Sequence, residues 1–101
     1  PKDIIRVRGL EIQADAMRVL VNNREISLTS TEYGLLYFFA TNPGIVFSKE
    51  RLFESVWGED SFGDNATVAV HIQKIRKKIE KNPAEPEYIE TVWGMGYRFN
   101  S

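Results

Sequence analysis

The sequence predicts a single α+β domain with an amino-terminal antiparallel sheet, three helices and a carboxy-terminal β-hairpin. Three observations predict this order. Residues 1–28 read as short strands without helix caps, residues 29–81 contain three capped helical patterns, and residues 88–99 contain two strand-like segments around a glycine-containing turn. With 101 residues, of which 43% are apolar, the chain can build one core, so residues 1–101 are expected to form one domain.

Four short segments predict the strands of the amino-terminal sheet. They are residues 4–8, 10–14, 17–21 and 25–28. Asn22 and Asn23 lie between the last two segments, and because Asn tolerates a positive φ, this pair suits a tight hairpin turn. We expect three or four antiparallel strands.

The first helix is predicted to begin near Ser30. Thr29 and Glu32 have the spacing of a capping box, and Leu28 and Tyr33 can form a hydrophobic staple across it. The segment 42–44, Asn-Pro-Gly, is expected to stop the helix. The apolar face consists of Leu35, Leu36, Phe39 and Ala40.

A short extended link at residues 45–47 precedes the second helix, which is predicted to run from an N-cap at Ser48 to Gly58. Its apolar positions are Leu52, Phe53, Val56 and Trp57. A polar, acidic loop follows at residues 59–65, with Phe62 as its one aromatic residue. Asp64 or Asn65 is expected to cap the third helix.

Residues 65–81 predict a third helix with two unlike faces. Val68, Ile72, Ile75 and Ile79 form one apolar stripe that is expected to enter the core. The opposite side is predicted to carry Thr67, His71, Lys74 and Lys78, flanked by Ala66, Val70, Gln73 and Lys77, with Arg76 at the border.

This third segment is also unusually basic. Residues 66–81 contain five Lys or Arg and one Glu, a net charge of +4, and small residues occupy the first turns. Such a helix suits the major groove of DNA, where the first turns meet base edges and later cations meet phosphates. After two prolines at 83 and 86, residues 88–93 and 97–99 predict the strands of a terminal hairpin around Gly94-Met95-Gly96.

Three helices followed by a hairpin is the winged helix-turn-helix arrangement, and four segments make the resemblance specific. LTSTEYGLL (28–36), PGIVFSKERLFESVWG (43–58), TVAVHIQKIRKKIE (67–80) and TVWGMGYRF (91–99) resemble the carboxy-terminal effector domains of OmpR/PhoB-type bacterial response regulators. The resemblance covers almost the whole chain. It implies sequence-specific binding to double-stranded promoter DNA, with the third helix in the major groove and the hairpin, the wing, at the adjacent minor groove.

The resemblance also implies which residues contact DNA. It places Lys49 and Trp57 near the DNA backbone, while Thr67, His71, Gln73, Lys74, Arg76 and Lys78 lie on the recognition helix, and Thr91, Trp93 and Tyr97 lie around the wing. The family uses the loop between the second and third helices to touch RNA polymerase, here Glu59, Asp60, Phe62 and Asp64. Ala66, Ala69 and Trp93 depart from the residues Arg, Asp and Arg that are frequent in the family at these positions.

The resemblance further implies partners beyond this chain. Family members are controlled by an amino-terminal receiver domain that is phosphorylated on aspartate, and no receiver is present in this sequence, which opens at Pro1 and is expected to be a fragment. Two copies are expected to bind head to tail on direct repeats. The resemblance implies a bacterial protein, and a cytoplasmic location is expected because no cysteine, signal peptide or membrane-length apolar run is present.

Two other functions compete with this interpretation. A winged helix that binds only protein is the first alternative, which the net charge of −1 favours. An enzyme such as a nuclease is the second, but the acids of the 59–65 loop have no supporting motif. His71 is the only histidine and there is no cysteine, so neither a metal site nor a cofactor is expected.

Overall fold

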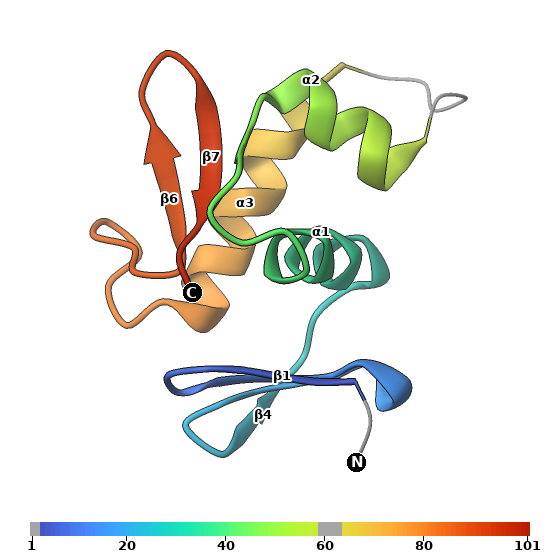
Figure 1. Cartoon of the computed structure of the whole chain (residues 1–101), viewed down its shortest axis with the longest axis vertical. Helices are drawn as coiled ribbons and strands as arrows, with labels where there is room; N and C mark the ends of the chain where they lie inside the picture. The colour runs from blue at the N-terminus through green and yellow to red at the C-terminus, as the bar shows by residue number, and fades with distance from the viewer. Residues whose placement is uncertain (1–2, 59–63) are drawn as a thin grey trace.

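The computed structural model describes residues 3–58 and 64–101 (Figure 1). A four-stranded antiparallel sheet comes first, with strands β1 (Ile4–Val7), β2 (Leu10–Gln13), β3 (Arg18–Val21) and β4 (Arg24–Ile26) in sequential order. Asn22 and Asn23 have φ values of 50° and 67°, which confirms the predicted hairpin turn between β3 and β4. A short 3₁₀ turn, η1 (Ala14–Ala16), links β2 to β3; of its residues only Ala14 was predicted as strand, because residues 15–16 lie between the two predicted strands.

Helix α1 (Ser30–Ala40) begins where the sequence predicts it. The Thr29 hydroxyl accepts a bond from the Glu32 amide at 3.1 Å, and the Glu32 carboxylate accepts one from the Thr29 amide at 3.0 Å, so the capping box is confirmed. The predicted apolar positions of this helix are all buried. Figure 1 shows α1 lying across the middle of the molecule, between the four-stranded sheet and the remaining elements.

The second helical segment is less regular than predicted. The Ser48 hydroxyl caps α2 (Lys49–Leu52) by accepting a bond from the Arg51 amide at 3.1 Å. The backbone then widens into a π-helical turn, η2 (Phe53–Trp57), and ends at Gly58 with φ of 93°. Leu52 is fully buried, whereas Phe53, Val56 and Trp57 are only partly covered.

Helix α3 (Ala66–Ile79) is two residues shorter at its carboxyl end than the predicted segment, because Glu80 turns into extended backbone. The Asp64 carboxylate accepts a bond from the Ala66 amide at 2.5 Å, while the Asn65 side chain makes no capping bond. Asp64 is therefore the capping side chain of the two that the sequence allowed.

The wing is a three-stranded sheet, not a simple hairpin. Strands β6 (Ile89–Val92) and β7 (Gly96–Phe99) form the predicted hairpin, and β5 (Val46–Phe47), predicted as a link, pairs with β7 to give the order β5-β7-β6. Gly96 makes this pairing possible, because a Cβ at this position would collide with the Phe47 carbonyl.

One apolar core joins these elements. Side chains of the amino-terminal sheet, α1, α2, α3 and the wing belong to a single cluster of buried residues. The α+β class and the predicted order of sheet, three helices and hairpin are thus confirmed, and α3 lies with one face in the core beside the wing.

Candidate nucleic-acid interface

Helix α3 presents an exposed face whose centre differs from the predicted one. The apolar stripe of Val68, Ile72, Ile75 and Ile79 is buried, as predicted. At 100° per residue, the direction opposite this stripe passes between Val70 and Lys77. The exposed face therefore consists of Ala66, Val70, Gln73, Lys74 and Lys77, all of which are exposed to solvent. We call these five residues the outer face of α3.

The predicted position of the exposed stripe, opposite the core, was wrong for three of its four residues. Thr67, His71 and Lys78 lie roughly a quarter turn to one side of the outer face, so they do not lie opposite the core. Thr67 and His71 are half-buried. Only Lys74 of the four predicted residues belongs to the outer face.

His71 is held against the end of the second helical segment. Its ring lies edge-on to the Trp57 ring, with centroids 5.0 Å apart, and Trp57 in turn stacks on Phe53 at 5.5 Å. The His71 Nδ1 atom is 2.9 Å from the Thr67 carbonyl oxygen. Because a carbonyl oxygen only accepts, Nδ1 carries the proton and donates, and Nε2 is the ring nitrogen that can contact a ligand.

Lys78 pairs with a buried carboxylate on another helix. Its Nζ atom lies 2.7 Å from Glu32 Oε1. Burial raises the pKa of Glu32, but the bonds from Lys78 and from the Thr29 amide outweigh it, so the pKa lies below its ordinary value. Lys78 thus links α3 to the capping box of α1, and a DNA contact by this residue remains a prediction.

Arg76 is buried between α3 and the wing, with only 6% of its surface exposed. Its guanidinium donates to the Ile89 carbonyl from Nε at 3.1 Å and from Nη2 at 2.7 Å, and Nη2 also donates to the Thr91 hydroxyl at 2.8 Å. The group lies 5.6 Å from the centre of the Tyr97 ring. Burial lowers the pKa of Arg76, and the neighbouring Tyr97 and Glu80 oppose that shift.

Arg76 therefore connects the predicted recognition helix to the wing. Its position was predicted at the border of the exposed face, whereas the structure directs its side chain inward, onto β6. This contact also fixes Thr91 and Tyr97, two of the residues predicted near the wing.

The wing tip exposes two large apolar side chains. Trp93 is 88% exposed and Met95 is 67% exposed, on either side of Gly94, whose φ is 80°. Between this tip and α3 lies an open hollow of about 550 Å³. Its lining includes five predicted residues, namely Gln73, Arg76, Thr91, Trp93 and Tyr97.

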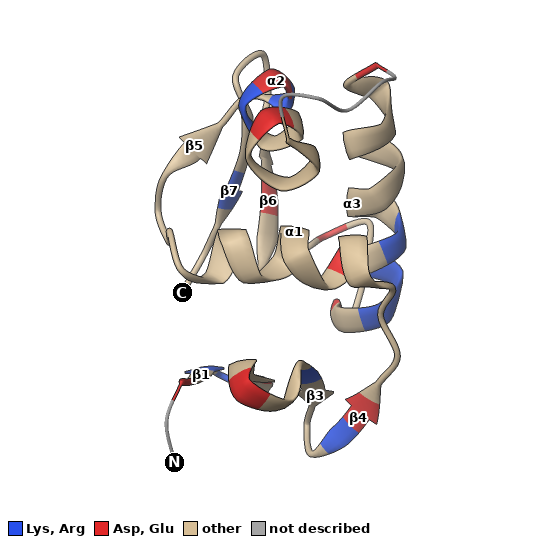
Figure 2. Cartoon of the chain, turned by 90° about the vertical axis from the view of Figure 1, so that its right-hand side faces the viewer, with Lys and Arg blue, Asp and Glu red and all other residues tan. Residues whose placement is uncertain are grey.

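Charge is distributed unevenly over this surface. Figure 2 shows the lysines and the arginine of α3 on its carboxy-terminal half, while the amino-terminal half carries no Lys, Arg, Asp or Glu. Lys49, the first residue of α2, is exposed. The interface thus has an uncharged half near the start of α3 and a basic half further along the helix.

Most of the predicted acidic contact loop lies outside the described residues. Glu59, Asp60 and Phe62 belong to the range 59–63, so their predicted contact with RNA polymerase stays a prediction. Asp64 is described, and its carboxylate caps α3.

Two structural groups near the site were missed in the sequence. Glu80 is 7% exposed, and its carboxylate accepts bonds from the amides of Glu87, Tyr88 and Ile89, at 2.7, 3.1 and 2.9 Å. This holds the start of β6 against the end of α3. An acid at the carboxyl end of a helix interacts unfavourably with the helix dipole. The position of Glu80 in the sequence was therefore a signal that its carboxylate has other partners.

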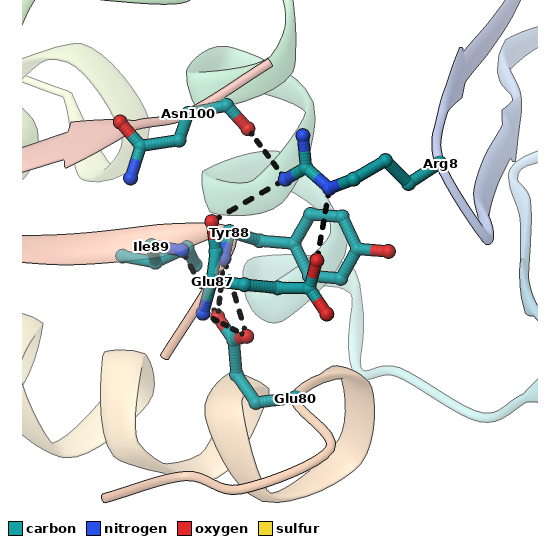
Figure 3. Close-up of polar contacts among 6 residues, drawn as sticks. All are labelled: Arg8, Glu80, Glu87, Tyr88, Ile89 and Asn100. Atoms are coloured by element: carbon teal, nitrogen blue, oxygen red, sulfur yellow. Dashed lines mark hydrogen bonds and ion pairs between the residues drawn. The ribbon is translucent and has the colours of Figure 1, made fainter. Parts of the chain in front are cut away.

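Arg8 makes the second missed set of contacts, which Figure 3 shows. Its guanidinium donates to Glu87 Oε2 at 2.8 Å and to the Asn100 carbonyl at 3.1 Å, and it lies 4.9 Å from the centre of the Tyr88 ring. Arg8 thereby joins the β1–β2 turn to the residues just before β6 and just after β7. No local pattern signals a contact between residues this far apart in the sequence.

Two absences concern only the part of the chain that the structure describes. No group of three or more His, Asp or Glu side chains there is arranged to hold a metal ion. Among the same residues, no helix has both the length and the apolar character needed to cross a membrane.

Comparison with known sequences places the chain among transcription regulators. The family model described as "Transcriptional regulatory protein, C terminal" matches residues 23–99. The chain is 46% identical over 95 residues to the uncharacterised transcriptional regulatory protein YcbL of Bacillus subtilis, an alignment that covers 94% of this chain and 42% of YcbL. The chain therefore spans less than half the length of this curated relative.

Solved structures agree with the sequence comparison. The response regulator DrrB of Thermotoga maritima, described as an OmpR/PhoB homologue, superposes with a TM-score of 0.90 at 35% identity, covering 97% of this chain and 44% of DrrB. The RstA DNA-binding domain of Klebsiella pneumoniae, solved in complex with the RstA box, gives a TM-score of 0.86 at 28% identity and covers 97% of both chains.

Proposed function

Because this chain belongs to the family of OmpR/PhoB-type transcriptional regulatory proteins, as a carboxy-terminal domain, we propose that it binds promoter DNA sequence-specifically as the output domain of a two-component regulator. The observation that carries the proposal is the outer face of α3, which is uncharged where it begins and basic where it ends, beside an exposed wing. The similarity of this chain to the RstA DNA-binding domain, which was solved in complex with the RstA box, supports the same function.

In the proposed complex, α3 lies in the major groove and the wing reaches the adjacent minor groove. The amino-terminal half of the outer face meets base edges, and Lys74, Lys77 and Lys49 meet phosphates. Trp57, Thr67 and His71 flank the groove from the side of α2. Trp93 supplies the contact at the wing tip.

Four of the predicted contact residues act by positioning other elements in this proposal. Arg76 fixes the wing relative to α3, and Thr91 and Tyr97 are its partners. Lys78 fixes α3 relative to α1 through Glu32. Their effect on DNA affinity would then be indirect.

The proposal extends to the partners of a longer regulator, because this chain spans less than half the length of its relative YcbL. A receiver domain regulates the activity, two copies bind head to tail on direct repeats, and the acidic loop contacts RNA polymerase. This function implies no catalysis and a bacterial cytoplasmic location.

Salt-dependent binding to DNA fragments tests this function. We expect the logarithm of the association constant to fall linearly with the logarithm of salt concentration when promoter fragments are titrated by fluorescence anisotropy. Lys74→Ala should reduce that slope by about one unit if Lys74 contacts a phosphate. Arg24→Ala is the matched control, because it removes an equal charge from an exposed position in β4.

The outcomes separate the two competing functions. A slope that Lys74→Ala and Arg24→Ala change equally would refute the assigned face. No salt-dependent binding to any fragment would instead favour a module that binds only protein.

A further inference from the structure

Val70 lies near the centre of the outer face of α3, with 52% of its surface in solvent. The fold does not require an apolar residue there, because α3 buries the opposite stripe. A β-branched residue also has a lower helix propensity than Ala, Lys or Glu. An exposed Val on this face is therefore explained more readily by a ligand with an apolar group than by the stability of the helix.

The major groove offers one such group. Among the four bases, only thymine presents a methyl group at the groove edge, and small apolar side chains are its usual partners. Ala66, exposed one turn before Val70, keeps the approach to this position open and adds a second small apolar side chain.

Gln73 lies three residues after Val70 on the same face and also lines the hollow beside the wing. Its amide has one acceptor oxygen and one donor nitrogen, which match N6 and N7 of adenine, whereas guanine presents two acceptors there. Three residues advance about 4.5 Å along a helix, close to the spacing of about 3.4 Å between base pairs. Val70 and Gln73 can therefore face neighbouring base pairs.

No positive charge precedes Lys74 on the outer face, so the turns around Val70 offer no cation to guanine. Guanine is read most often by Arg or Lys, and the first cation on the outer face is Lys74, followed by Lys77. Ala66, Thr67, Ala69 and Val70, which occupy the first turns, carry no charge.

We propose that the outer face of α3 selects A·T base pairs at the centre of its half-site, with Val70 against a thymine methyl group and Gln73 on the neighbouring adenine. This inference rests on the proposed function and names the class of sequence that it recognises. The specificity-determining residues are Val70 and Gln73, and the lysines supply affinity.

The test begins with selection from a pool of duplex DNA, randomised over about two helical turns. The 101-residue chain should enrich sites with adjacent A·T pairs. Selected sites are then remade with deoxyuridine in place of single thymines, which removes only the methyl group. We expect affinity to fall about fourfold at one thymine, the loss of one buried methyl group.

Protein variants locate the effect. Val70→Ala should bind the thymine and deoxyuridine sites equally, because its shorter side chain no longer reaches the methyl group. Gln73→Ala should lose about 5- to 150-fold on the selected site and become indifferent to 7-deazaadenine at one adenine. Arg24→Ala, distant on β4, should keep both preferences.

Other results would overturn the inference. Enrichment of G·C pairs at the centre of the half-site would do so, and so would a deoxyuridine effect that persists undiminished in Val70→Ala. Failure to enrich any sequence, with no salt-dependent binding, would overturn the proposed function itself and is distinguishable from these two results.

Discussion

Arg76 shows how a single side chain can couple α3 to the wing. It makes three hydrogen bonds to β6 and also contacts the Tyr97 ring, so its guanidinium sets the distance between α3 and the wing. Because these bonds need donors in a planar fork, a lysine cannot reproduce them.

We predict that Arg76→Lys destabilises the fold by about 1 to 3 kcal/mol, since the Ile89 carbonyl loses donors in a buried place. DNA affinity should fall by similar factors on cognate and unrelated sequences, with the salt slope preserved, because the charge remains. Urea unfolding and anisotropy at several salt concentrations measure both effects. A loss of affinity confined to the cognate sequence would contradict this positioning role of Arg76.

Trp93 is a second residue whose role follows from exposure and charge. Its ring is almost fully exposed at the wing tip and is neutral, so it cannot use the negative potential of a narrow A·T-rich minor groove as arginine does. Its flat surface can pack along sugars, and its N–H can reach one phosphate.

We predict that Trp93→Ala lowers affinity for cognate and unrelated DNA alike, by roughly fivefold or about 1 kcal/mol. Trp93→Arg should raise affinity for sites with A·T-rich flanks. The affinities of both variants for operators that differ only in flanking sequence test this prediction. A change of flank preference in Trp93→Ala, at unchanged overall affinity, would mean that Trp93 reads sequence or shape.

At the scale of elements, the contact between α1 and α3 depends on pH through Glu32. The pKa of this carboxyl is lowered in the folded chain, so its stabilising contribution is complete above the ordinary value of 4.5 and is lost as pH falls through the folded pKa. Above pH 4.5, the Lys78 ion pair and the capping box both hold the ionised form.

We predict that Glu32→Gln is less stable than the unsubstituted chain near neutral pH, and that the difference shrinks as pH falls below about 4.5. The free energy of unfolding in urea, measured across this range, tests the prediction. Lys78→Met should weaken the same pH dependence, since it removes the hydrogen bond that contributes most to lowering the pKa of Glu32. A constant difference at all pH values would contradict it.

The helical elements were predictable because their signals are local. The capping box at Thr29 and Glu32 and the apolar stripe of α3 each depend on residues within a few turns of one another. The pairing of β5 with β7 was not predictable from two residues, because a strand of that length has no period of its own.

The candidate site was predictable only in outline. The basic character of α3 and the terminal hairpin were predicted from the sequence. The inward direction of Arg76 and the pairing of Lys78 with Glu32 depend on partners 13 to 46 residues away, which no periodicity encodes. The centre of the outer face has a different origin: it follows from the apolar stripe and the rotation of 100° per residue, so it could have been placed between Val70 and Lys77 from the sequence.

At the scale of the whole molecule, Arg8 links the amino-terminal sheet to the wing hairpin (Figure 3). Arg8 itself has a φ of 52°, a conformation that costs a side-chain-bearing residue about 1 kcal/mol or more. The contacts to Glu87, Asn100 and Tyr88 offset this cost.

Two substitutions separate the backbone cost from the contacts. We predict that Arg8→Ala loses stability, whereas Arg8→Gly loses the same contacts but tolerates the positive φ and is more stable than Arg8→Ala by about 1 kcal/mol. Thermal unfolding of both variants measures the difference. DNA affinity of the folded variants should be unchanged, and a loss of affinity would show that the sheet influences the interface.

The close approach of Gly96 to the Phe47 carbonyl sets a boundary within the wing. The strand junction behind Gly96 tolerates no side chain, while residues 93–95 at the tip are exposed. A tip transplanted from a relative could therefore begin after Val92 and stop before Gly96 without disturbing the hairpin. The tip at residues 93–95 can therefore be exchanged as a unit, which allows flank preference to be engineered separately from the rest of the domain.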